Sequence, residues 1–361
     1  MTSRLRQAHQ GLRNDPNYII AGSMDFALEG YFPSVNLING QYMMTLFKFH
    51  KSGAMELRQP QSTDVPAVAE AGFRARECLS LTVQTVDASI AAGDHARFDF
   101  FVEGHRLRRL LIDGESLVVF SMLVKFFKTG TYGFAVRNGG ATPDASYVDE
   151  FTVNASDVWE LKTFIVPLGP GTAIGSNWDY VNGIGLRCTI TLAAGTDFQT
   201  AGGQWTSGNK FATLNQVNGV DSTSNTFKIA LVDGRPGSVP QPFVPVGGDY
   251  DRELEHIGRL YEKSYNLAVI PGTVTHAGVD HEVTNSSGVF RQSRSFLVAK
   301  RVTPSITYYN PQTGTAGEGY DGANRTFSQS PVYVGEGRFT TGETVGLDSL
   351  IRWHWTADAR F

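Results

Sequence analysis

The chain has 361 residues, with 31 Lys and Arg against 35 Asp and Glu and a formal net charge of −4. This length exceeds the size at which one hydrophobic core stops growing, so we expect two or more domains. The mild negative charge gives no reason to expect nucleic acid as a partner, and no stretch approaches the ~18 continuous apolar residues of a membrane span.

Residues 1–17 carry Arg4, Arg6 and Arg13 with little apolar content. This composition predicts an N-terminal arm that precedes the fold and either frays or docks on a neighbouring subunit. The segment lacks the apolar region of a secretory signal, so we expect synthesis in a cytoplasm.

The segment from residue 18 to residue 246 reads as one strand after another. Residues 79–86 alternate apolar and polar side chains with period two, as a half-buried strand does. Residues 117–127 are more continuously apolar, which fits a central strand covered on both faces. Further strands are predicted at 132–137, 147–153, 159–166, 184–191 and 226–232. Their spacing and their Gly- and Asn-rich connections indicate a jelly-roll sandwich.

Residues 236–248 form a proline-rich linker, because prolines lack the N–H groups that strands of a sheet donate to one another. This linker marks the end of that domain. A linker helix is predicted within residues 247–265, where Asp249 or Asp251 can cap the N-terminus. A stripe of Leu254, Ile257, Tyr261 and Tyr265 would follow one face of this helix. The helix either packs on its own domain or lies along a threefold axis as an oligomer contact.

Strands return in residues 266–361, at 296–301, 305–309, 331–334, 338–341 and 350–356. The predicted fold is therefore all-β: a jelly-roll β-sandwich, a Pro-rich linker and one short helix, then a smaller C-terminal β-domain. Cys78 and Cys188 are expected to be free thiols rather than a disulfide, since nothing in the sequence brings them together.

Sugar recognition needs a flat aromatic ring and nearby amides or carboxylates for the hydroxyl groups. Two loop-like stretches supply such residues, because aromatic side chains there are flanked by Gly, Ser and Asn. The carbohydrate-binding candidates are Trp178, Tyr180, Asn177, Asp179 and Trp205. Many aromatic residues in loops of this kind instead have a structural role and close the end of their own sandwich. Trp159, Trp353 and Trp355 lie in predicted strands and are expected in the core or a subunit interface.

No catalytic residue and no metal ligand is assigned from the sequence. Carboxylates lie close together in the sequence at Asp149 and Glu150 and at Asp280 and Glu282. Adjacent residues of a strand, such as Asp149 and Glu150, point to opposite faces, and nothing in the sequence fixes the separation of carboxylates that glycoside hydrolysis needs. His276 and His281 match no zinc signature. No cofactor is expected, although Asp25 is of a type that serves in structural calcium sites.

Several segments together resemble phage tail-fibre and head-fibre proteins that carry a carbohydrate-binding-module-like jelly roll and a companion C-terminal β-domain. The residues that carry this resemblance are 79–83, 87–94, 101–104, 128–132, 147–154, 159–163, 183–187, 191–195 and 216–218, and then 259–265, 301–307, 310–315 and 354–359. The sequence departs from the pattern at 31–49, where a tryptophan-bearing strand is expected, and at 230–235.

The resemblance implies a non-enzymatic virion protein, a fibre or spike on head or tail that attaches the particle to host surface polysaccharide. It implies a homotrimer that contacts other virion proteins through the N-terminal arm. Two alternatives remain: a decoration or adaptor protein that makes only protein contacts, and a polysaccharide depolymerase.

Overall fold

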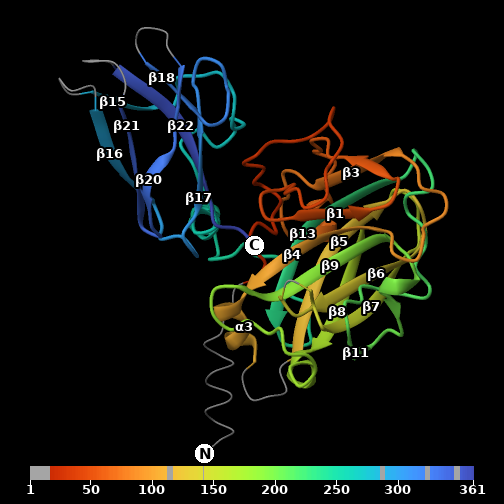
Figure 1. Ribbon diagram of the computed structural model, residues 1–361. Helices are drawn as coiled ribbons and strands as arrows, with labels where there is room; N and C mark the ends of the chain where they lie inside the picture. Colours follow the sequence, from red (N-terminus) through yellow and green to blue (C-terminus); the bar gives the residue numbers. More distant parts are fainter. Residues whose placement is uncertain (1–16, 112–116, 141, 285–288, 322–325, 345–349) are drawn as a thin grey trace, which may run out of the picture.

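The computed structural model describes residues 17–111, 117–140, 142–284, 289–321, 326–344 and 350–361 (Figure 1). The predicted arm therefore lies outside the described residues except for Asn17. The Asn17 side-chain amide donates to the Val232 carbonyl oxygen at 3.0 Å, and its Oδ1 accepts from the Gly234 amide at 3.0 Å. The chain thus enters the fold beside Thr226–Pro236, the last strand of the sandwich in sequence order.

Two mainly antiparallel sheets form the larger unit, in the strand orders β1-β4-β9-β6-β7-β11 and β2-β3-β13-β5-β8. The first comprises β1 (Lys48–Ser52), β4 (His95–Glu103), β6 (Gly130–Arg137), β7 (Ala145–Val153), β9 (Ile184–Ala194) and β11 (Gln204–Ser207). The second comprises β2 (Glu56–Arg58), β3 (Leu79–Thr85), β5 (Leu117–Phe126), β8 (Glu160–Pro167) and β13 (Thr226–Pro236). The remaining elements are β10 (Gln199–Thr200), β12 (Ala212–Thr213), α2 (Val68–Ala71), α3 (Gly104–Leu110), α4 (Leu168–Gly171) and the 3-10 helix η2 (Thr196–Phe198).

An aromatic core joins the two sheets. Phe134 of the six-stranded sheet stacks on Phe164 of the five-stranded sheet, with ring centroids 4.1 Å apart, and also meets Phe120 at 5.5 Å. Side chains at alternate strand positions point into this core, as the period of two requires. The prediction of an all-β fold with a jelly-roll sandwich is confirmed.

The C-terminal unit is built around one long strand, β22 (Leu350–Asp358), which pairs with β14 (Tyr261–Lys263), β15 (Asp280–Val283), β17 (Ser305–Tyr309) and β18 (Glu318–Asp321). β19 (Thr326–Ser328) extends this sheet, and β16 (Val289–Ser295), β21 (Arg338–Thr344) and β20 (Pro331–Val334) form a second one. Trp353 and Trp355 are buried in its core, as expected. The strand predicted at 296–301 is wrong: β16 ends at Ser295, and Phe296 instead turns into the core.

The linker helix α5 spans Tyr250–Gly258, capped by the Asp249 side chain, which accepts from the Arg252 amide. The predicted extension to Tyr265 is wrong, because Tyr261 already belongs to β14 and pairs with Asp358 of β22. The predicted oligomer stripe is therefore not a helix face. Ile257, Tyr261 and Tyr265 are buried and Leu254 is half-buried within this chain, so sheet pairing and burial decide the conformation here.

The two cysteines, Cys78 and Cys188, are free and buried, as predicted. Within the described residues, no helix has the length and apolar character needed to cross a membrane.

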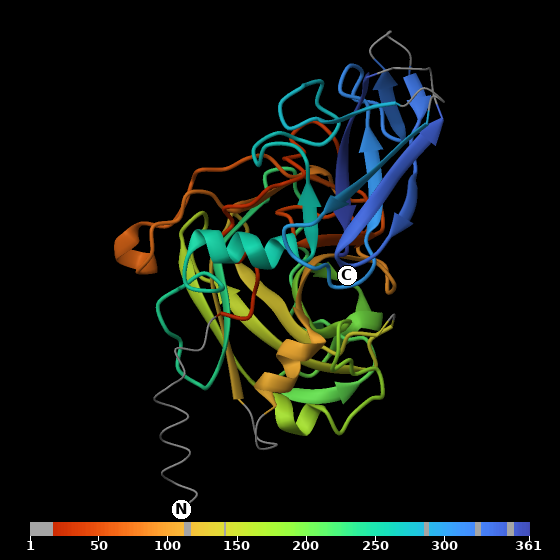
Figure 2. The same ribbon diagram turned by 90° about the vertical axis from the view of Figure 1, so that its left-hand side faces the viewer.

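A polar contact surface connects the C-terminal unit to the sandwich. Figure 2 shows α5, in blue-green, lying against the sandwich at the foot of the C-terminal strands. The Arg360 guanidinium is nearly buried there; it pairs with Glu29 and Asp358 and donates to the Thr45 carbonyl oxygen at 2.9 Å. It also lies over the Tyr42 ring, 3.8 Å from its centroid. One arginine therefore joins both units.

Replacing Arg360 by Ala should loosen this contact, because it leaves the partly buried Glu29 without its cation. Breaking one side of a buried pair costs about 3–5 kcal/mol. We expect a lower free energy of unfolding and a larger radius of gyration in small-angle X-ray scattering. Arg252→Ala, which removes an exposed arginine of α5, should change neither quantity. An unchanged radius of gyration and unfolding free energy in Arg360→Ala would contradict this role.

Glu253 of α5 makes a second testable contribution. Its side chain is buried and accepts a hydrogen bond from Ser23 at 2.9 Å, and burial raises its pKa from 4.5 to about 7. The folded protein therefore holds a proton that the unfolded chain releases. The contribution of Glu253 to the free energy of unfolding is therefore fully present below pH 4.5. It decreases by about 3 kcal/mol as the pH rises from 4.5 to about 7. Urea unfolding of the wild type should show this decline, and Glu253→Gln should reduce it, whereas Glu255→Gln on the exposed face should not.

Candidate functional site

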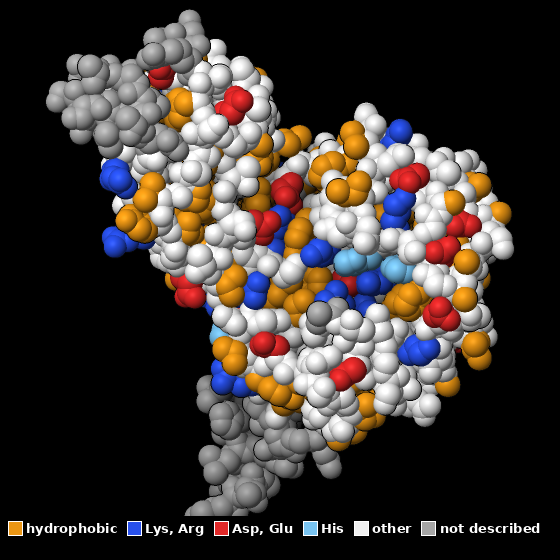
Figure 3. All heavy atoms as spheres, viewed as in Figure 1, with side chains coloured by type: hydrophobic (Ala, Val, Ile, Leu, Met, Phe, Trp, Pro, Cys, Tyr) orange, Lys and Arg blue, Asp and Glu red, His pale blue; other side chains and the backbone are white. Residues whose placement is uncertain are grey.

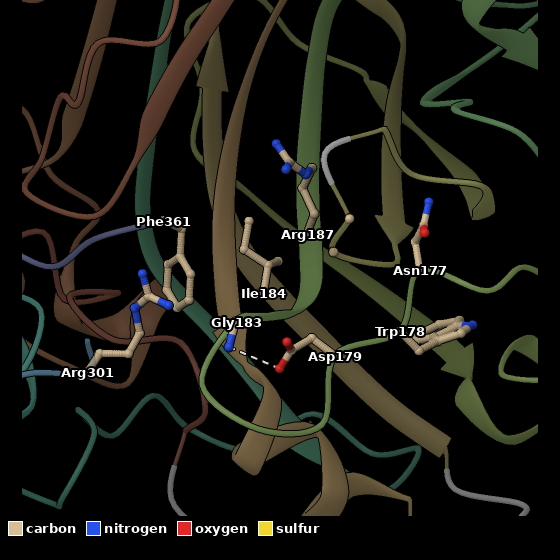
Figure 4. A pocket seen from close by; sticks show the side chains of 10 residues that line it. Asn177, Trp178, Asp179, Gly183, Ile184, Arg187, Arg301 and Phe361 are labelled. Carbon is tan, nitrogen blue, oxygen red and sulfur yellow. Dashed lines mark hydrogen bonds between the residues drawn. The ribbon is translucent and has the colours of Figure 1, made fainter. Parts of the chain in front are cut away.

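A pocket of about 490 Å³ lies where the sandwich meets the C-terminal unit (Figure 4). Side chains from β9, from the loop before it and from the end of the chain contribute to its walls. The lining residues are Gly139, Gly140, Asn177, Trp178, Asp179, Gly183, Ile184, Arg187, Arg301 and Phe361. Figure 4 shows Phe361 and Arg301 on one side, Asn177 and Trp178 on the other, and Ile184 and Arg187 between them.

The loop that forms one wall is held by the carboxylate of Asp144. Its Oδ2 accepts from the Ser176 amide at 2.8 Å, and its Oδ1 accepts from the Asn138 side-chain amide and the Asn177 amide. These hydrogen bonds, led by that from Asn138, lower the pKa of Asp144 to about 2. The ionised carboxylate therefore fixes this loop across the ordinary pH range.

The Asp179 carboxylate holds the next turn of the same loop by accepting hydrogen bonds from main-chain amides. Its Oδ1 accepts from the Val181 amide at 2.8 Å and from the Gly183 amide at 3.0 Å, the latter drawn in Figure 4. Main-chain donors therefore occupy one of its two oxygens. Asn177 is engaged in the same way, since its side-chain amide donates to the Thr142 carbonyl oxygen at 2.8 Å.

The two loop tryptophans pack on each other rather than standing free. Their rings lie 5.7 Å apart at 60°, and each indole N–H donates to a main-chain carbonyl: Trp178 to Ile174 and Trp205 to Pro167. In Figure 4 the Trp178 ring points away from the other labelled side chains. Gly171 lies under Trp205, and a Cβ built there would be 2.1 Å from the ring. Both indoles thus close the end of the sandwich.

The structure brings together three of the five predicted carbohydrate-binding residues. Asn177, Trp178 and Asp179 line the pocket, whereas Tyr180 and Trp205 contact the sandwich core and are not among its lining residues. Sequence reasoning missed Arg301 and Phe361 on the opposite side of the pocket and Arg187 between the two sides. Arg187 occurs within a predicted strand with nothing to mark it, and Arg301 and Phe361 are more than a hundred residues away along the chain.

The other candidate groups do not form a site. Asp149 and Glu150 are adjacent in β7; Asp149 Oδ1 accepts from the Glu150 amide, and Glu150 accepts from Thr213 and Asn215. Asp280 pairs with Arg294 and accepts from the Trp355 indole. His276 and Asp280 both act on the pKa of His354, but in the part of the chain that the structure describes neither they nor His281 and Glu282 belong to a group of three possible metal ligands.

Metal ligation finds no geometric support in the described part of the chain, where no three His, Cys, Asp or Glu side chains gather as ligands would. Asp25, the candidate calcium ligand, is partly buried, and that burial raises its pKa.

No protein-family model matches the chain, and no curated protein matches it either. Among solved structures it is similar to a family 11 carbohydrate-binding module from Clostridium thermocellum in complex with a beta-1,3-1,4-mixed-linked tetrasaccharide, at 8% identity and a TM-score of 0.29, covering 57% of this chain and 96% of that one. It is also similar to a putative sugar binding protein from Bacteroides thetaiotaomicron, at 10% identity and a TM-score of 0.30, covering 61% and 100%. A third is discoidin II from Dictyostelium discoideum, at 7% identity and a TM-score of 0.20, covering 84% and 93%.

Because Asp144 holds the loop that forms one pocket wall, we expect its replacement to open this loop. Asp144→Ala removes the acceptor that holds the Ser176 and Asn177 amides, so the loop should open locally while the sandwich stays folded. Hydrogen exchange at residues 174–179 should become at least tenfold faster, as expected from losing charge-assisted hydrogen bonds of about 1.5–3 kcal/mol. Asp251→Ala on the exposed side of α5 should leave these amides unchanged. Equal exchange in the Asp144 variant would show that the loop does not depend on this carboxylate.

Proposed function

We propose that this chain is a non-catalytic attachment protein, a fibre or spike of a tailed-phage or phage-like particle that binds host surface polysaccharide. The observation that carries the binding part is the pocket between the two units. It offers an aromatic ring at Phe361, an apolar floor at Ile184 and hydrogen-bonding groups at Asn177 and Arg187. Such a mixture suits a sugar, whose C–H face packs on a ring while its hydroxyls need polar partners.

The virion part of the proposal rests on the resemblance of the sequence to phage fibre proteins. It assigns the N-terminal arm to contacts with other virion proteins and makes the assembled form a homotrimer. Location is tested by identifying the chain in purified particles and mapping its position and symmetry by electron cryomicroscopy. Light scattering of the purified protein measures the oligomer directly.

A second candidate is an adaptor that makes only protein contacts. The observation that favours it is an apolar strip on the outer side of the edge strand β8, where Leu161 and Ile165 are exposed. Exposed large apolar residues close together on an edge strand are typical of subunit interfaces. Failure to bind any host polysaccharide, together with loss of assembly in Leu161→Asp, would favour this candidate over attachment.

The pocket predicts which aromatic residue matters for binding. Phe361→Ala removes the ring but leaves its main-chain oxygen, which accepts from Lys48 at 2.8 Å. We expect about tenfold weaker binding to host capsule in affinity electrophoresis, since an aromatic contact contributes about 0.5–1.5 kcal/mol beyond the area it buries. Tyr333→Ala, which removes an exposed aromatic on β20, is the matched control and should bind normally. Binding that is equally strong in both variants would remove the pocket from the proposal.

A further inference from the structure

A cluster of basic side chains covers part of the outer face of the six-stranded sheet. Arg97, Arg137 and Arg187 come from three different strands and all reach the carboxylate of Asp99. The Arg137 and Arg187 guanidinium nitrogens lie 3.1 Å and 3.2 Å from its oxygens, and Arg97 pairs with it as well. His50 Nε2 lies 3.4 Å from the same carboxylate. In Figure 3, basic and histidine side chains lie side by side in a hollow over the strands labelled β4, β9 and β6 in Figure 1.

The cluster contains more positive than negative charge. Three guanidinium groups surround one carboxylate, and within the described residues no other carboxylate pairs with any of the three. Burial lowers the pKa of His50 to about 3, so this histidine adds no charge near neutral pH. The excess is therefore about two positive charges.

The hydrogen bonding of the cluster is incomplete as well. The Nε atoms of Arg97, Arg137 and Arg187 are buried, and each lacks a hydrogen-bond partner in the described structure. Unsatisfied buried donors cost free energy, about 1–3 kcal/mol each. A site with this much unpaired positive character attracts an anion.

The pocket gives an anion access to this charge. Arg187 belongs to the cluster and also lines the pocket, with only 13% of its side chain exposed. Arg301 approaches from the other wall, where its donors bind the carbonyl oxygens of Asn182, Ala359 and Arg360. Carbonyl partners position a guanidinium without neutralising it. Within the described residues no carboxylate is in direct ion-pair contact with Arg301, and the carboxylates of Glu103 and Asp179 act on its pKa only from a distance. Asp179 is the acidic group of the lining, and main-chain amides hold its Oδ1.

We propose that this pocket binds the carboxylate of an acidic saccharide, a uronic-acid-type residue, between Arg187 and Arg301. This inference rests on the proposed function and names the class of polysaccharide. The planar guanidinium matches a carboxylate, with which it forms paired, charge-assisted hydrogen bonds. Phe361, whose ring lies 4.4 Å from the Arg301 guanidinium carbon, is placed to contact the sugar ring.

The wild-type protein alone gives the first test. Binding is measured by isothermal calorimetry to polygalacturonate, to the same polymer with its carboxyl groups reduced to alcohols, and to dextran sulfate. We expect polygalacturonate to bind at least about tenfold more tightly than the reduced polymer, the ratio for one charge-assisted contact of about 1.5 kcal/mol. Equal binding of both would overturn the inference while leaving the proposed function intact. Equal or tighter binding of dextran sulfate would also overturn it, by showing a general affinity for polyanions. If the protein bound neither these polymers nor host capsule, both the inference and the proposed function would be wrong.

A variant series assigns the effect to residues. Arg187→Gln should weaken polygalacturonate binding about tenfold and leave binding of the reduced polymer unchanged, and Arg187→Lys should restore part of it because the charge returns. Arg252→Gln, an exposed arginine of α5, is the control. A melting temperature within the range of the control shows that the variant is folded. If Arg187→Gln binds both polymers as the wild type does, the assignment to this pocket is wrong.

Discussion

Asp99 is fully buried on the outer face of the six-stranded sheet, and the arrangement of that face follows from its charge. Burial alone would raise its pKa, but the surrounding arginines, Arg97 first, hold it well below its usual range. An ionised carboxylate in this position needs partners from several strands, and it takes them from β1, β4, β6 and β9. Thr189 donates to it at 2.6 Å as well. Removing it would leave three guanidinium groups facing one another, a far larger cost than the loss of one hydrogen bond.

The position of the pocket also depends on contacts at the outer face of the six-stranded sheet. Glu103, at the end of β4, pairs with Arg259 at 2.9 Å, and Asn182 exchanges hydrogen bonds with Arg301. These contacts hold the C-terminal unit beside the end of β9, where the basic cluster reaches the surface. Since the two walls of the pocket belong to different units, their separation depends on this polar interface and on Arg360. The shape of the pocket and the packing of the two units are therefore coupled in this molecule.

Alternating apolar and polar side chains made the strand at 79–85 predictable from the sequence, and the strands at 305–309 and 331–334 were predicted as well. β4 was not predicted, although Phe98 and Phe100 alternate with charged residues. The alternation is typical of a half-buried strand, but it does not reveal that Arg97 and Asp99 on its outer face are buried and paired with each other. The helix was placed correctly at its start, where the Asp249 cap is a local signal. Its end was not, because Tyr261 leaves the helix to pair with a strand almost a hundred residues away.

The candidate site shows the same division between local and distant information. Asn177, Trp178 and Asp179 could be found because a polar, glycine-flanked loop with an aromatic residue is visible in a short window. The tryptophan was the strongest of these signals, yet its indole N–H is satisfied by Ile174 and its ring closes the sandwich. Arg187 and Arg301 carry no local signal, because an arginine in a strand becomes informative only when its partners are known. What distinguishes these two arginines is that few carboxylates lie near them in space. The sequence does not show this, because the residues around each arginine in the fold come from distant parts of the chain.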